Sequence, residues 1–242
     1  MAAVRAPAHQ EWRWHTVERA ALLASVPIFE QVAPSTLQRL AEGFRPKRVT
    51  RGEFVFFEGE PANALNLVAE GRVKTIRETR EGRQVILRLI NPGELFGVSG
   101  GWGERLYPAS ARALEDTVVL QLPARQFTAL LAQHPELAMA VIRGLADRLR
   151  EAEARVLDLQ TERVEQRMAR ALLRLAGPTG LGPVRAGHMN LALSRQDLAD
   201  LAGTTLSTAS RTLSAWHRQG IVLAGREQVS ILDVAALEAL AE

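Results

Sequence analysis

Cysteine is absent from this 242-residue chain, and so is any long hydrophobic run. Without cysteine there can be no disulfide, no thiolate nucleophile, no zinc–cysteine site and no cysteine-ligated iron–sulfur cluster. No apolar run approaches the roughly 20 residues that a bilayer span needs, and the N-terminal residues show no signal-peptide core. We therefore expect a cytoplasmic protein with no membrane partner, whose sensing chemistry does not depend on cysteine.

Charge is nearly balanced, which limits what it can indicate. The formal net charge is +3, the sequence pI is about 10.1, and 47% of the residues are hydrophobic. That composition can bury a core in one large domain or two modest ones. A small positive excess is weak evidence for a nucleic-acid partner, because the distribution of charge matters more than its total.

Glycine-containing turns recur about every 10 residues between Val49 and Leu122. Short β-branched or alternating runs lie between these turns, and such spacing is typical of an antiparallel barrel or sandwich. The predicted strands are 54–57, 65–68, 73–76, 85–90 and 117–122.

A single long helix is predicted from Pro135 to about Gln160, where Gly144 is the only glycine and no further proline occurs. Apolar residues follow a 3,4 spacing along it, as at the a and d positions of a coiled coil, and charged residues flank them. We expect two copies of the chain to pair along this seam, although its first turns could instead pack on the chain's own barrel. The seam residues are Ile142, Leu145, Leu149, Ala152, Val156 and Leu159.

Two short helices separated by one glycine are predicted between Ser194 and Trp216. Ser194 and Asp197 have the spacing of a capping box, Gly203 permits the turn, and Thr205 offers a second N-cap hydroxyl. A regular helical spacing would direct Leu206, Ala209, Leu213 and Trp216 to the core, and Ser207, Thr208, Ser210 and Arg211 to the surface. This pattern indicates a helix-turn-helix that presents its second helix to DNA, and an ordinary helical hairpin is the alternative.

The surrounding segments extend this module. A further helix is predicted over 164–175 and a loop over 180–187. After the two helices, 221–223 and 228–232 are predicted as two strands joined by a turn, which together form a winged helix-turn-helix.

The whole order resembles the bacterial family of the cyclic-AMP receptor protein and the fumarate-nitrate reduction regulator (Crp/Fnr), from about Leu22 onward. The resemblance rests on short motifs that occur in the family's order: 22–29, 57–61, 70–74, 91–97 and 208–211. It implies an α+β protein with an N-terminal antiparallel β-roll similar to a cyclic-nucleotide-binding jelly roll, a long dimerisation helix and a C-terminal winged helix-turn-helix. We expect an N-terminal extension and helix at 1–24, the β-roll effector domain at 25–133, the dimerisation helix at 134–161 and the DNA-binding domain at 162–242.

The resemblance also implies how DNA would be read. Arg211 matches the arginine that reads guanine, which a guanidinium can do bidentately through O6 and N7. Ser210 matches a base-contacting serine, and Thr205 and Thr208 match phosphate-contacting hydroxyls. Ser207 replaces the family's common glutamate, a departure that puts the full half-site in doubt. We expect a homodimer on double-stranded DNA with inverted-repeat, TTG-like half-sites, with RNA polymerase as a partner if the protein is an activator. The expected DNA-binding residues are Arg211, Ser210, Ser207, Thr208, Thr205 and Arg195.

The effector is harder to predict, because the family's cyclic-nucleotide site is not matched. Val98 stands where that site has a glutamate, and Pro108-Ala109 where it has an arginine-serine pair. A buried phosphate without a cationic partner would bear a large desolvation cost. The candidate pocket residues are Gly97, Val98, Trp102, Arg105 and Tyr107.

Haem is the cofactor worth testing. The recognition-helix segment resembles that of nitric-oxide-responsive denitrification regulators, and His15, His134 and Met139 are conceivable axial ligands, although a histidine in an N-terminal segment or just before a helix is usually only a solvated side chain. The cofactor therefore stays undetermined.

Two other function classes remain open at this point. The chain could be a ligand-binding module that acts through protein partners, and a strongly salt-dependent affinity for DNA would argue against that. An enzyme is disfavoured, because the sequence shows no nucleophile–base–orienter constellation and no cluster with metal-ligand spacing.

Overall fold

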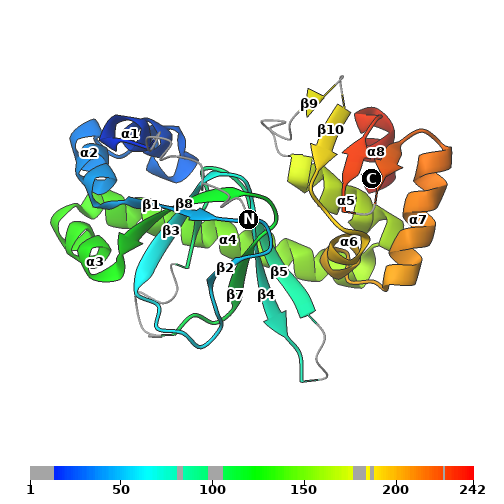
Figure 1. The fold of residues 1–242 in the computed structure, drawn as a ribbon, viewed down its shortest axis with the longest axis horizontal. Helices are drawn as coiled ribbons and strands as arrows, with labels where there is room; N and C mark the ends of the chain where they lie inside the picture. The colour runs from blue at the N-terminus through cyan, green and yellow to red at the C-terminus, as the bar shows by residue number, and fades with distance from the viewer. Residues whose placement is uncertain (1–13, 81–83, 98–105, 177–183, 186–187, 226) are drawn as a thin grey trace, which may run out of the picture.

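The structure is a computed structural model that describes residues 14–80, 84–97, 106–176, 184–185, 188–225 and 227–242. A β-roll with its covering helices lies at one end and a helical domain with a small sheet at the other, and the long helix α4 runs between them (Figure 1). Among the helices of these ranges, none has the length and apolar character of a bilayer span.

Two four-stranded sheets form the roll, and every pairing in them is antiparallel. The first sheet has the order β1-β8-β3-β6 and the second the order β2-β7-β4-β5. Their bounds are β1 Arg45–Val49, β2 Phe54–Phe56, β3 Ala64–Glu70, β4 Val73–Glu78, β5 Gln84–Ile90, β6 Leu95–Phe96, β7 Ser110–Ala113 and β8 Thr117–Pro123.

Strands β1, β6 and β7 of the roll were not predicted from the sequence. β1 reads Arg-Pro-Lys-Arg-Val, which has neither alternation nor a hydrophobic run. It lies at the edge of its sheet, where a proline is tolerated because one side needs no ladder hydrogen bond. Its strand structure therefore follows from pairing with β8, a segment distant in the sequence.

Helices close the end of the roll. They are α1 Thr16–Ser25, a 3₁₀ turn Pro27–Phe29, α2 Pro34–Gly43 and α3 Ala124–Gln133. Fully buried side chains such as Leu23, Phe29 and Leu40 join the sheet residues Leu67 and Leu122 in one cluster. Their apolar faces form the core of this end of the molecule.

Gly71 occupies a turn that no other residue fits. Its φ is +76°, and an added Cβ would lie 2.6 Å from the carbonyl oxygen of Asp116 and 2.9 Å from the Cα of Thr117. We expect Gly71→Ala to lower the free energy of unfolding by more than the ~1–2 kcal/mol that left-handed strain alone costs. Urea unfolding followed by circular dichroism measures it.

Gly59→Ala is the matched control for that substitution. Gly59 has a φ of +81°, but nothing lies within 4 Å of its added Cβ. Gly59→Ala therefore introduces the backbone strain without a steric clash. Equal losses in the free energy of unfolding of the two variants would refute the close-approach explanation for Gly71.

The long helix α4 spans Pro135–Thr161. Its first turns pack on the roll through Leu137, Ala140 and Val141, whereas its later apolar residues are exposed in the single chain. Gly144 lies at the closest approach, because a Cβ there would be 2.3 Å from Cδ1 of Ile28. The packing of the 3₁₀ turn on α4 thus explains a glycine inside a helix.

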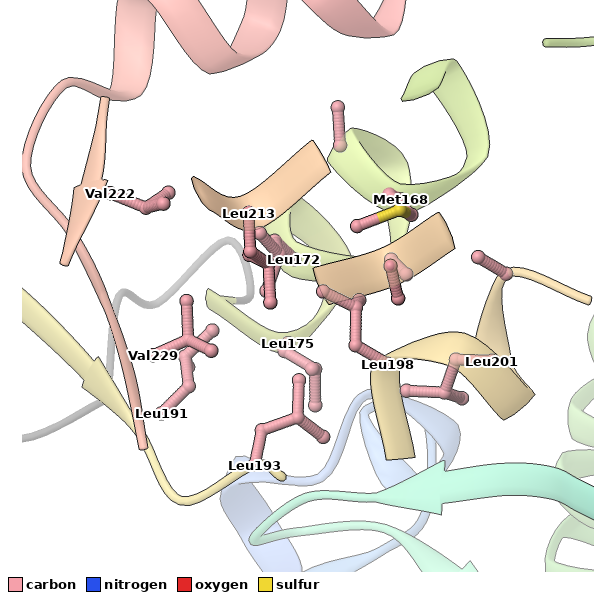
Figure 2. Close-up of a cluster of buried hydrophobic side chains, with 14 of the residues drawn as sticks. Met168, Leu172, Leu175, Leu191, Leu193, Leu198, Leu201, Leu213, Val222 and Val229 are labelled. Carbon is pink, nitrogen blue, oxygen red and sulfur yellow. The ribbon is translucent and has the colours of Figure 1, made fainter. Parts of the chain in front are cut away.

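The C-terminal domain surrounds one apolar cluster, drawn in Figure 2. Side chains from α5, α6, α7 and the small sheet converge there, among them Met168, Leu172, Leu198, Leu213 and Val229. The sheet has the order β11-β12-β10-β9. The bounds are α5 Val164–Ala176, β9 Val184–Arg185, β10 His188–Leu191, α6 Arg195–Leu201, α7 Leu206–Arg218, β11 Val222–Ala224, β12 Val229–Ile231 and α8 Val234–Ala241.

The prediction of a loop over 180–187 was wrong at β9. This two-residue strand pairs with β10, with Val184 opposite Met189 and Arg185 opposite His188. A strand this short has no periodicity of its own, so only its partner reveals it.

Candidate nucleic-acid interface

The first helix of the pair, α6, begins with the predicted capping box. The Ser194 Oγ accepts a hydrogen bond from the Asp197 backbone N–H at 3.0 Å, and the Asp197 Oδ2 accepts one from the Ser194 N–H at 3.1 Å. Gly203 then takes a φ of +60° in the turn. The local signals that predicted the start and end of α6 are confirmed.

The second helix, α7, begins where its cap was predicted. Thr205 is the N-cap residue, and its Oγ1 accepts a hydrogen bond from the Thr208 N–H at 3.2 Å. This cap fixes the end of the helix from which polar side chains project. Because the helix N-terminus carries a partial positive charge, it favours an anionic partner such as a phosphate.

The buried face of α7 is formed by Ala209, Leu213 and Trp216, as predicted, and also by Thr212. The prediction for Leu206 was wrong, because 46% of this side chain is exposed. Leu206 is the first residue of α7, and this end of the helix lies outside the apolar cluster. A regular spacing cannot show where a helix leaves its core.

The outer face of α7 gathers hydroxyl groups and one guanidinium. The Thr205 Oγ1 lies 3.0 Å from both the Ser207 Oγ and the Thr208 Oγ1, and the Arg211 Nη2 donates to the Thr208 Oγ1 at 3.5 Å. Ser207 and Arg211 are exposed, and Ser210 is partly exposed. Donors and acceptors of this kind can contact phosphates and base edges.

Helix α7, which carries this face, lies on the far side of α6 from the roll. Figure 1 shows α7 at the outer edge of the C-terminal domain, with α6 between it and strands β4 and β5. Arg195 is the first residue of α6 and is partly exposed. The six side chains predicted to contact DNA therefore belong to two adjacent helices and the turn before the second.

Only part of the predicted effector pocket can be compared with the structure. Val98, Trp102 and Arg105 lie outside the described residues. Gly97 has a φ of +72°, and an added Cβ would lie 3.1 Å from Cε1 of Tyr107. The two described pocket residues are therefore neighbours.

Tyr107 belongs to a packed aromatic cluster inside the roll. Its ring stacks on that of Phe56 with 3.6 Å between centroids, and Phe56 also stacks on Phe96 at 5.9 Å. The Tyr107 hydroxyl donates to the Ala64 carbonyl oxygen at 3.0 Å, and burial raises the pKa of this phenol. In this arrangement Tyr107 fills the roll interior, and its role in binding an effector stays a prediction.

The three conceivable haem ligands lie on different elements and in different environments. His15 is exposed at the N-cap of α1, and Met139 is half exposed on α4. His134 occupies the N-cap position of α4, and its Nδ1 lies 3.2 Å from the Thr36 Oγ1 and 3.4 Å from the Glu136 Oε1. Within the described residues, no cluster of three or more histidine and carboxylate side chains could hold a metal ion.

Comparison with known proteins gives a match for each of the two domains. Residues 46–134 match the cyclic nucleotide-binding domain, and residues 166–240 match the Crp-like helix-turn-helix domain. The cyclic AMP receptor protein of Thermus thermophilus is 36% identical over 215 residues, which cover 89% of this chain and 96% of that protein. The chain belongs to the Crp/Fnr family.

Other members of the Crp/Fnr family agree. The transcriptional activator protein Anr of Pseudomonas aeruginosa is 31% identical over 81% of this chain and 80% of its own. The structure of FixK2 from Bradyrhizobium japonicum matches with a TM-score of 0.71 at 28% identity, over 82% of this chain and 98% of that one. This chain is therefore a DNA-binding transcription regulator with a sensor domain, and not an enzyme.

Proposed function

We propose that this Crp/Fnr regulator binds, as a homodimer, an inverted repeat of TTG-like half-sites through the outer face of α7. The observation that carries the proposal is the group of hydroxyls and the Arg211 guanidinium on the exposed face of α7, toward its N-terminal end. Arg211 supplies the fork that reads guanine, and Thr205 and Thr208 supply phosphate contacts. Ser210 contacts a base edge, and Arg195 contacts the backbone from α6.

Ser207 defines where this regulator departs from its family. A glutamate at this position would accept a hydrogen bond from cytosine N4, whereas a serine hydroxyl can both donate and accept. Ser207 is engaged with the Thr205 Oγ1 at 3.0 Å. We therefore propose weaker selection at the base pair beside the guanine, with the guanine itself still required.

The dimer is proposed to form along the exposed apolar residues of α4. The six predicted seam residues are all exposed in the single chain, and all of them except Ala152 are large apolar side chains. A row of such side chains on a surface marks an interaction site. Members of this family dimerise, and a parallel pair of such helices would bury the seam. Two-fold symmetry would then set the half-sites about one helical turn of DNA apart.

Selection from a random pool of duplexes tests this proposal. The full chain is incubated with the pool at physiological salt, and bound DNA is amplified and sequenced through several rounds. We expect a palindrome with a guanine at matching positions in both halves, and an affinity that falls steeply as salt rises. A pool that yields no enriched sequence, or one without two-fold symmetry, would refute the proposal.

We propose an effector other than a cyclic nucleotide held in the family's manner. The predicted site lacks its glutamate and its arginine-serine pair, and Phe56, Phe96 and Tyr107 fill the roll interior. A nitric-oxide response through haem is the specific alternative. An absorption spectrum of the purified protein tests it, because a Soret band would support haem and a colourless protein that binds its operator would oppose it.

A further inference from the structure

A buried ion pair joins the two domains of this chain. The Nζ of Lys74, on β4 of the roll, lies 2.5 Å from the Oδ1 of Asp197, on α6 of the helix-turn-helix. Each residue is only 9% exposed. The pair connects segments 123 residues apart in the sequence.

Apolar contacts surround this ion pair. Ile76 and Ile86, from the β4–β5 hairpin, belong to the same buried cluster as Leu198 and Leu201 of α6. The hairpin thus contributes to the core of the DNA-binding domain. Nonpolar burial supplies most of the attraction between such surfaces but does not fix their orientation, because the hydrophobic effect is non-directional.

Asp197 performs two tasks with its two carboxylate oxygens. Oδ1 accepts from Lys74, while Oδ2 accepts from the Ser194 N–H and from the Ser194 Oγ at 2.7 Å. Burial alone would raise the pKa of this carboxyl, but the hydrogen bonds from Lys74 and Ser194 outweigh it, and the pKa lies below its ordinary value. The carboxylate that caps α6 is therefore also bonded to the roll.

Arg155 of α4 adds hydrogen bonds to this contact between the β4–β5 hairpin and α6, which we call the joint. Its guanidinium donates to the carbonyl oxygens of Leu87 at 2.6 Å, Ile86 at 3.2 Å and Leu201 at 3.2 Å. Strand β5, helix α4 and helix α6 are thus held to one another by a single side chain. The joint has directional contacts from both the roll and the dimerisation helix.

We propose that the Lys74–Asp197 pair positions the DNA-binding domain for its operator. It fastens α6 to the roll and leaves the outer face of α7 open, so it supports binding and does not block it. A dimer must present two recognition helices at a fixed separation, and a preorganised joint removes the cost of ordering each domain on the DNA. Lys74 and Asp197 are positioning residues that touch no base. This inference rests on the proposed binding of an inverted repeat.

The test compares Lys74→Met with Lys47→Met, since the chain contains only these two lysines. Lys47 lies on β1, where its Nζ is 3.4 Å from the Val55 carbonyl oxygen within the roll. Each variant is titrated with the selected operator and with a duplex that carries one half-site. We expect Lys74→Met to weaken operator binding about tenfold, within the usual range of coupling between sites, and to leave half-site binding unchanged.

Asp197→Asn completes a double-variant cycle. An asparagine oxygen can still accept from the Ser194 N–H, so the cap is kept while the charge is lost. We expect this variant, and the double variant with Lys74→Met, to match Lys74→Met alone. Equal losses on operator and half-site, equal losses for Lys47→Met, or tighter operator binding by Lys74→Met would each overturn the proposal.

A second measurement needs no DNA and so separates this inference from the proposed function. With ¹⁵N-labelled lysine, the full chain has two side-chain ammonium groups, and Lys47→Met assigns them. We expect the Lys74 signal to be protected from exchange with water and to lose that protection in Asp197→Asn. A Lys74 signal unaffected by Asp197→Asn would refute the joint, whereas failure to select an operator would refute only the proposed function.

Discussion

Arg211→Ala is expected to abolish most of the specific affinity for the operator. Each bidentate arginine–guanine contact contributes about 1–3 kcal/mol of discrimination, and a dimer makes two, so the loss is about 2–6 kcal/mol or at least ~30-fold. Arg211 is exposed on α7, and only the Thr208 hydroxyl receives a hydrogen bond from it among the contacts described for this side chain. The fold should therefore be unaffected. Fluorescence anisotropy with operator and random duplexes measures the effect.

Arg218→Ala is the matched control on the same helix. Arg218 is also exposed, lies in the last turn of α7, and donates to the Ser214 carbonyl oxygen at 3.4 Å. Its loss should change binding to both duplexes by similar small amounts, because a distant charge acts on phosphates without reading sequence. If Arg211→Ala weakened operator and random DNA equally, Arg211 would not be the residue that reads guanine.

Leu149→Glu is expected to dissociate the dimer. Leu149 is 60% exposed in the single chain and lies in the middle of the predicted seam. Burying one leucine contributes about 1.5–3 kcal/mol, and the change removes two per dimer and adds two facing carboxylates. The dimer dissociation constant should rise at least ~100-fold, and operator binding should fall with it. Analytical ultracentrifugation measures the first quantity.

Leu157→Glu distinguishes the seam from the rest of the helix. Leu157 is 59% exposed on α4 but does not belong to the 3,4 spacing. We expect this variant to remain a dimer with normal operator affinity. Monomers from both variants, or from Leu157→Glu alone, would place the contact on another face of α4.

Local signals predicted much of this molecule, and nonlocal contacts account for what they missed. The Ser194–Asp197 capping box, the Gly203 turn and the Thr205 cap depend on residues three or four apart, and all were confirmed. Strand β1 forms because β8, which is distant in the sequence, pairs with it. Strand β9 has only two residues and forms because β10 pairs with it. Asp197 shows the limit most clearly, because its capping role was evident from spacing while its bond to Lys74 was not.

The open face of α7 affects how such a regulator distributes between its operator and nonspecific DNA. Because neither the roll nor α4 covers that face in this structure, the face is available for electrostatic attraction to DNA of any sequence. A sensor domain that altered only the placement of the two recognition helices would then change the ratio of operator affinity to background affinity, and not the occupancy of DNA as a whole. A rotation of about 10° at a helix ~17 Å from the two-fold axis moves it ~3 Å, close to the rise of one base pair. The regulator would lose its register at the operator while continuing to scan the genome.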